Sequence, residues 1–245
     1  MFYGSISDGG KAQCISGTQP SYSKTTAQQY EAIQNFHSDA KFFGGAIVEV
    51  IIDLLMMFGK STDLQGVYGN GNMSGYDSSA SPTYGVKANA VVGGGQFYGS
   101  SDGTSLNKIL HSIVLGTYQQ WMRDPYEIVV NGAVKVSKDY TYDVTGATYE
   151  DTGVRSPDGK AGWHYPTIYL PADGYGSIPD LSSTEGSTST GPCDGTYPNN
   201  TQSSVTAVLL RFGVCGGGAL GGLRARNWSR VATYATWDIG FAVFL

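Results

Sequence analysis

The chain has 245 residues, enough for one large domain or two small ones, and only 14% of them are charged against a usual share of about 25%. Its 35 glycines are about twice the usual share of ~7%, and its formal net charge is −5. The acidic balance argues against a general nucleic-acid binder, which needs a basic stripe, and the composition fits neither a disordered nor a collagen-like chain.

Cysteine usage and apolar runs argue against several further classes of protein. Cys14, Cys193 and Cys215 are an odd number without a C-x-x-C pair, so neither a disulfide scaffold nor a zinc ribbon is expected, although Cys193 and Cys215 could form one bridge. Met1–Gly4 lacks the basic and apolar regions of a secretory signal. The longest apolar run, Ala46–Phe58, is far shorter than the ~20 residues that span a bilayer. We therefore expect a soluble protein, synthesised in a cytoplasm and not inserted into membranes.

The N-terminal part of the chain predicts a lead-in followed by a helix. Residues 1–24 are polar and turn-rich, which indicates a peripheral segment. Thr26 and Gln29 have the spacing of a capping box, and apolar residues follow near helical spacing. Together these signals predict a helix over residues 26–38.

Ala46–Phe58 predicts a second, strongly apolar helix that lies against the core. Gly44-Gly45 breaks the chain before it, and Gly59 is a natural stop after it. Glu49 and Asp53 lie four residues apart and therefore share one face of this helix.

The middle of the chain predicts loops and β-structure. Glycine, serine and asparagine dominate residues 61–105, which indicates a long region of loops and short strands. The clearest local signal is Asn131-Gly132, a pair typical of a type I′ turn, between the alternating segments Tyr126–Val130 and Ala133–Ser137. Tyr140–Val144 predicts a further strand.

The C-terminal part predicts a frame of two strands around a polar segment. Val208–Phe212 and Ile239–Leu245 are apolar runs that read as buried strands. The segment between them is rich in glycine, arginine, tryptophan, asparagine and serine, which is typical of a binding face held by a rigid frame; the alternative is a loop-rich edge without a role. Residues 180–204 predict a polar loop inserted within one domain that spans residues 25–245.

No catalytic or metal-binding constellation stands out in the sequence. His37, His111 and His164 are isolated, and Gly59-Lys60-Ser61 lacks the first glycine of a phosphate-binding loop. We therefore expect no catalytic residues, no metal and no cofactor. Scattered carboxylates leave a glycan hydrolase as a minor alternative.

Three segments, in this order, resemble those of a known family. Leu115–Asp124 resembles the G-N-x-W-E-W-x-x-(D/G) segment of the C-type-lectin-like fold shared with formylglycine-generating enzymes, and Gly116 and Trp121 carry the match. Leu170–Pro179 resembles the L-P-x-x-G-Y-G-x-x-P segment of gut-phage and prophage structural proteins. Residues 210–241 resemble the closing pattern of the family, in which an R-G-G strand leads to a variable face and ends in W-x-I-G-F-R.

The resemblance implies an α+β fold of the C-type-lectin-like class, irregular and loop-rich, with two helices and short antiparallel sheets. It also implies a phage or prophage virion protein, made in the host cytoplasm, that acts as a tail-tip or fibre adhesin; some relatives are targets of diversity-generating retroelements. The expected partners are other virion subunits and a host surface glycan or protein, and the expected assembly is a homotrimer. The alternative is a capsid-decorating or tail-assembly subunit without receptor binding.

The variable positions of the family lie between the last two core strands and face the receptor. Carried over here, they give a candidate ligand-binding face of ten residues: Val214, Gly217, Ala219, Leu220, Arg224, Arg226, Asn227, Trp228, Ser229 and Arg230.

Aromatic residues divide between this face and the core. Trp228 and Tyr234 are expected to offer contact area at the face, whereas Trp121, Trp163 and Trp237 are expected to pack inward. The enzymatic branch of the family needs a cysteine pair, and Cys215 stands alone in its region, so we expect no enzymatic activity of that kind.

Overall fold

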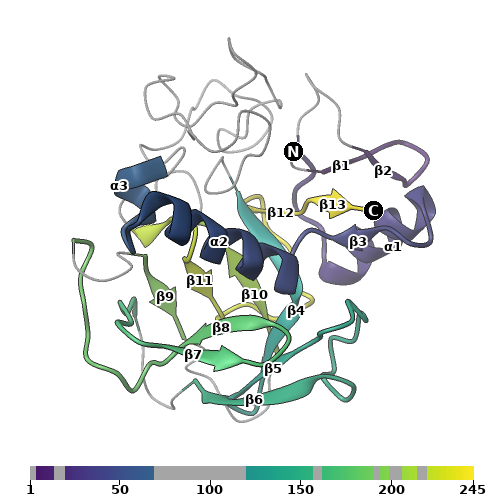
Figure 1. The fold of residues 1–245 in the computed structure, drawn as a ribbon. Helices are drawn as coiled ribbons and strands as arrows, with labels where there is room; N and C mark the ends of the chain where they lie inside the picture. Colours follow the sequence, from purple (N-terminus) through teal and green to yellow (C-terminus); the bar gives the residue numbers. More distant parts are fainter. Residues whose placement is uncertain are drawn as a thin grey trace.

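A computed structural model describes residues 4–13, 20–68, 120–156, 162–189, 194–198, 206–213 and 220–245. These residues form a loop-rich fold of three helices and several small sheets, so the predicted α+β class is confirmed (Figure 1). A short third helix, α3 (Leu64–Tyr68), joins the two that the sequence predicts. None of the helices in these ranges is long and apolar enough to cross a bilayer.

Helix α1 (Thr26–Phe36) begins with a capping box one residue earlier than predicted. The hydroxyl of Thr25 accepts a hydrogen bond from the Gln28 backbone N–H (3.2 Å), and the Gln28 side chain accepts one from the Thr25 N–H (2.9 Å). Thr26 is instead buried, and its hydroxyl donates to the carbonyl of Ala232 (2.8 Å). The assignment was wrong because two threonine–glutamine pairs with the same spacing follow one another in the sequence.

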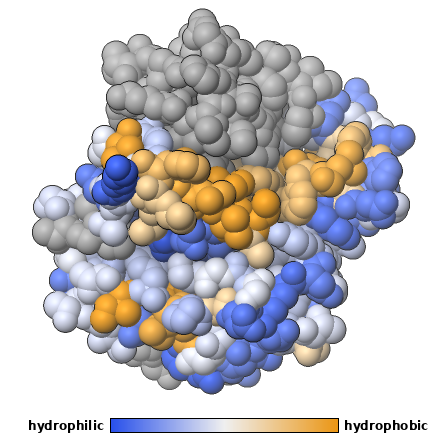
Figure 2. All heavy atoms as spheres, viewed as in Figure 1, coloured by the Kyte–Doolittle hydropathy of each residue, from blue (hydrophilic) through white to orange (hydrophobic). Residues whose placement is uncertain are grey.

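Helix α2 (Ala46–Gly59) confirms the predicted apolar helix, and Lys60 ends it in the left-handed conformation (φ 50°). One side of α2 packs Val48, Ile52 and Leu55 into the core. The opposite side is also apolar but lies in contact with solvent, and Figure 2 shows it as a hydrophobic band across the molecule. Its most exposed members are Val50, Leu54, Met57 and Phe58.

The central sheet is built around a long strand, β4 (Trp121–Val130). The predicted hairpin joins it to the next strand, and Asn131 (φ 49°) and Gly132 (φ 79°) both have the positive φ of a type I′ turn. The sheet order is β6-β5-β4-β10-β11-β9, with β12 parallel to β4. The remaining strands of this sheet are β5 (Ala133–Val136), β6 (Glu150–Arg155), β9 (Thr196–Tyr197), β10 (Ala207–Arg211), β11 (Arg226–Asn227) and β12 (Ile239–Gly240).

Three sequence predictions about β-structure need correction. Residues 140–144 form no strand, because the Asp143 carboxylate accepts hydrogen bonds from the backbone of Thr145 (2.9 Å) and Thr148 (3.0 Å) and closes a turn there. Ile239–Leu245 is not one strand but two: β12 pairs with β4, and β13 (Val243–Phe244) pairs with β3 (Lys41–Phe42). Residues 180–204 are not wholly a loop, since β9 lies within them and extends the central sheet.

Two small hairpins pack against this frame. The first, β1 (Ser5–Ile6) with β2 (Ala12–Gln13), belongs to the predicted lead-in and packs Ala12 in one cluster with Phe42 and Phe241. The second, β7 (Tyr169–Ala172) with β8 (Gly176–Pro179), lies beside α2. Gly176 (φ 147°) makes this contact so close that a Cβ atom would collide with the side chain of Glu49.

Several residues singled out from the sequence lie outside the described part of the chain, and the predicted core tryptophans are buried to different degrees. The three cysteines, Gly116, His111 and most of the glycine-rich region 61–105 lie outside the described residues. Trp121 is buried, as predicted, and stacks on Trp163 with ring centroids 5.8 Å apart. Trp163 and Trp237 are only half-buried.

Candidate binding loop

A cluster of charged side chains is buried between α2 and the central sheet. Arg211 on β10 donates to Glu49 of α2 (2.6 Å) and to Asp124 of β4 (2.5 Å). Arg226 on β11 donates to the same oxygen of Glu49 (2.6 Å) and to Glu127 of β4 (3.2 Å). All five side chains have an exposed fraction of 0%. We call these five residues the buried ion cluster.

The two glutamates of the buried ion cluster differ in their electrostatics. Burial acts to raise the pKa of Glu49, but the guanidinium groups of Arg226 and Arg211 outweigh it and hold that pKa below its ordinary value. At Glu127 burial prevails over the same two arginines, and the pKa is raised. Glu127 also accepts hydrogen bonds from the indole of Trp228 (2.8 Å) and the hydroxyl of Tyr175 (3.1 Å). The cluster is therefore an internal network that ties helix to sheet, and within the described residues only Glu49 Oε2 and Arg226 Nη1 of its polar atoms lack a hydrogen-bond partner.

This network corrects the predicted ligand-binding face. Arg224, Arg226, Asn227 and Trp228 are buried, with exposed fractions of 3%, 0%, 8% and 0%, so they present no outer surface. The physical reason is pairing: Arg226 and Trp228 meet carboxylates of α2 and β4, and Arg224 reaches Asp53 of α2 (3.0 Å).

The other six positions of the predicted ligand-binding face fall into two groups, those outside and those within the described residues. Val214, Gly217 and Ala219 lie outside the described residues. Leu220 and Ser229 are half-buried, and Arg230 is exposed. The accessible part of the prediction therefore begins where the chain leaves β11.

The segment Ser229–Trp237, which we call the binding loop, connects β11 to β12. Residues 233–235 are exposed, and Tyr234 has an exposed fraction of 37%. The guanidinium carbon of Arg230 lies 4.5 Å from the centroid of the Tyr234 ring, within the range of a cation–π contact. Each partner restrains the other, so an arginine and an aromatic ring are presented together at the surface.

A buried arginine holds the binding loop from beneath. Arg123 of β4 donates to the carbonyls of Tyr234 (2.9 Å) and Ala232 (3.3 Å) in the loop and of Lys24 (3.2 Å) before α1, and also to the hydroxyl of Thr26. None of the ion pairs among the described residues includes Arg123; its two terminal nitrogens donate to neutral oxygens, and its Nε has no hydrogen-bond partner there. Burial lowers the pKa of Arg123 to about 10, which still leaves it charged at neutral pH.

Backbone contacts fix the rest of the loop. The Thr26 N–H donates to Ala232 (3.0 Å), the Ser23 N–H to Thr236 (2.9 Å) and the Trp121 N–H to Asp238 (2.8 Å). The side chain of Gln120 donates to the carbonyl of Trp237 (2.6 Å). The loop is thus preorganised, and little conformational entropy remains to be lost when it binds a partner.

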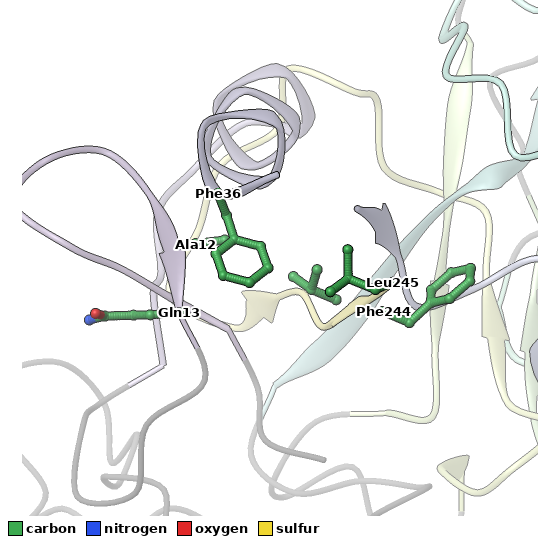
Figure 3. Close-up of a pocket in the computed structure, with 6 residues that line it drawn as sticks. Ala12, Gln13, Phe36, Phe244 and Leu245 are labelled. Carbon is green, nitrogen blue, oxygen red and sulfur yellow. The ribbon is translucent and has the colours of Figure 1, made fainter. Parts of the chain in front are cut away.

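Two other kinds of site, a metal centre and a ligand pocket, have less support in the described residues. Within the described ranges no three His, Cys, Asp or Glu side chains come together as metal ligands. A pocket of about 240 Å³ lies between β2, the end of α1 and β13 (Figure 3). Its lining is almost wholly apolar and has no titratable side chain: Ala12, Gln13, Phe36, Val243, Phe244 and Leu245.

Sequence reasoning found the position of the binding loop only in part. It named Arg230 and Tyr234, but it missed Arg123, which the sequence analysis placed only within the Leu115–Asp124 motif. The signal that could have identified Arg123 is its basic side chain within a segment that forms a buried strand. The sequence matches no protein-family model, and a search of curated proteins finds no match.

Proposed function

We propose that the protein is a receptor-binding subunit of a phage virion, built on a C-type-lectin-like domain, that contacts the host surface through the binding loop. The order of structural elements supports the fold part of this proposal. Trp121 of the first motif opens β4, Leu170–Pro179 forms the β7–β8 hairpin, and Trp237–Phe241 leads through β12. The described parts of the three motifs therefore lie in β4, in the β7–β8 hairpin and in β12.

The observation that carries the proposal is the pairing of an exposed cation–π contact with a buried anchor. Arg230 and Tyr234 lie at the surface, while Arg123 and the backbone of α1 and β4 hold the loop that bears them. Arginine and tyrosine are, with tryptophan, the residue types most enriched at the energetic centres of recognition surfaces; tyrosine offers large contact area at low entropic cost, and arginine offers a planar fork of hydrogen-bond donors. Repetition of one such loop in a homotrimer on a virion would raise avidity by ~10²–10⁴ where the geometry allows simultaneous contact.

Binding of labelled protein to a panel of candidate host cells tests the proposal. We expect the double variant Arg230→Ala, Tyr234→Ala to lose at least about tenfold in affinity, which corresponds to ~1.4 kcal/mol. Arg155→Ala is the matched control, because Arg155 is an exposed arginine on β6, at the opposite edge of the sheet. Wild-type protein that binds no cell, or a double variant that binds as the wild type does, would overturn the proposal.

The apolar outer side of α2 favours a second candidate, a structural subunit of the virion. Met57 and Phe58 have exposed fractions of 72% and 77%, and large exposed apolar patches usually mark protein–protein contacts. In this alternative a neighbouring virion subunit covers that side of α2. Light scattering of wild type and of Met57→Ser, Phe58→Ser separates the two: assembly that the double substitution abolishes, without any cell binding by the wild type, supports the structural role.

A further inference from the structure

Asp194 is a buried carboxylate that belongs neither to the buried ion cluster nor to the binding loop. Its exposed fraction is 1%. One oxygen accepts a hydrogen bond from the side chain of Gln65 on α3 (2.5 Å), and the other accepts one from the backbone N–H of Arg224 (2.6 Å). The same Gln65 nitrogen also donates to the carbonyl of Gly221 (2.6 Å). Asp194 thereby connects α3 to the Gly221–Arg224 turn.

The Gly221–Arg224 turn packs directly on this carboxylate. A Cβ atom on Gly222 would collide with it, so no side chain separates the turn from Asp194. The turn is held to the sheet by hydrogen bonds from Gly222 to Phe212 (2.8 Å) and, just before it, from Gly195 to Leu220 (3.0 Å). Any opening of the turn therefore brings Asp194 into contact with water.

No ion pair among the described residues compensates the charge of Asp194. The guanidinium of Arg224 points instead to Asp53 (3.0 Å). Of the other charged or titratable groups that face Asp194, Asp63 before α3 acts against ionisation, and Tyr169 of β7 stays neutral because its own pKa is raised to about 12 by burial. Burial raises the pKa of Asp194 to about 7, and the hydrogen bonds from Gln65 and from the Arg224 N–H, together with the positive charge of the Arg224 guanidinium, oppose this shift only in part.

We propose that Asp194 is a proton-sensitive anchor of the Gly221–Arg224 turn, which stays closed while this carboxyl carries a proton and opens more readily once it ionises. In the open turn the hydrated carboxylate regains an ordinary pKa of about 3.9. The folded value is the higher one, so the stabilisation is complete below pH ~3.9 and is lost as pH rises through about 7. The turn carries Arg224 and follows Leu220, two positions of the predicted face, but the proposal does not depend on receptor binding.

Hydrogen exchange of the full-length protein tests the anchor. With the two pKa values above, the opening equilibrium of the turn rises on the order of 100-fold between pH 5 and pH 8. We expect protection of amides in residues 221–225, corrected for the intrinsic pH dependence of exchange, to fall by about this factor. Asp194→Asn removes the titrating group and should abolish the pH dependence. Asp63→Asn, a change at a neighbouring half-buried carboxylate, should retain it.

Two results would overturn the anchor: the same pH dependence in Asp194→Asn as in the wild type, or no pH dependence in the wild type. Should Asp194→Asn fail to fold, the wild-type protein still decides the matter through its ¹³C carboxyl NMR signal. A titration midpoint for Asp194 near 7 supports the proposal, and a midpoint near the ordinary ~4 refutes it.

Discussion

Removal of the charge of Glu49 should destabilise the protein far more than any substitution of an exposed acid. Glu49→Gln keeps the shape of the side chain but takes away the carboxylate that both buried guanidinium groups approach most closely as a shared partner; Glu127, the other carboxylate they share, lies 3.6 Å from Arg211 and 3.2 Å from Arg226. Arg211 and Arg226 both lie 2.6 Å from its Oε1 atom, and all three side chains have an exposed fraction of 0%. Because all three side chains are fully buried, both arginines keep part of their desolvation cost without compensation when this charge is removed.

The magnitude follows from that geometry. Breaking one buried ion pair by removal of one partner costs ~3–5 kcal/mol. Glutamine keeps an oxygen within reach of both arginines but not the negative charge, which places the expected loss in the free energy of unfolding near the lower end of this range, at ~3 kcal/mol. In a chain of 245 residues this corresponds to a fall in Tm of about 6–12 °C.

Asp53→Asn is the matched control, because Asp53 lies one turn further along the same helix and also pairs with an arginine. Its side chain is 51% exposed, so the pair with Arg224 should contribute only ~0–1 kcal/mol. Equilibrium unfolding in urea, followed by tryptophan fluorescence, gives both values on one scale. Equal losses for Glu49→Gln and Asp53→Asn would refute the reasoning, because burial would then not decide the strength of these pairs.

Three further predictions concern the same frame. Glu127→Gln should lower the free energy of unfolding in urea by only ~1 kcal/mol, because burial raises the pKa of Glu127 and so disfavours its charged form. A loss as large as that of Glu49→Gln would contradict this. Arg123→Met should lower the free energy of unfolding by ~3 kcal/mol. It should also speed hydrogen exchange in residues 232–236 more than in β5, because two of the carbonyls that Arg123 holds lie in the binding loop. An equal increase in both segments would show that Arg123 does not anchor the loop. Gly176→Ala should lower the free energy of unfolding by ~2–3 kcal/mol and Gly153→Ala by only ~1 kcal/mol. Both glycines have positive φ, but only at Gly176 would a Cβ atom collide with Glu49. Equal losses for the two variants would show that the contact with Glu49 does not matter.

Local sequence signals were sufficient for the elements that are stabilised locally. The type I′ turn at Asn131-Gly132 and the apolar helix Ala46–Gly59 depend on neighbouring residues, and both are confirmed. Where two local signals competed, as at Thr25 and Thr26, the sequence could not choose, because burial of Thr26 depends on a contact with Ala232, 206 residues away.

The buried ion cluster could not be located in the same way, because its partners are distant in sequence. Arg226 lies 177 residues from Glu49 and 99 from Glu127, so the polar composition of residues 224–230 resembled that of a surface. One signal was nevertheless present. Glu49 in an apolar helix and Arg211 in an apolar strand are single charges at core-facing positions, and such charges need each other.

Burial separates the polar and aromatic side chains of residues 226–234 into two groups that should tolerate substitution differently. Arg226 of β11 and Trp228, which follows β11, are both fully buried and donate to carboxylates. Replacement of Arg226 removes an ion-pair partner of Glu49 and Glu127, and replacement of Trp228 removes a hydrogen bond to Glu127. Beyond Ser229 the side chains of Arg230 and Tyr234 contact each other and are exposed, while the backbone at Tyr234 is held by Arg123. Substitutions at Arg230 and Tyr234 should therefore leave the fold intact, whereas substitutions at Arg226 or Trp228 should destabilise it.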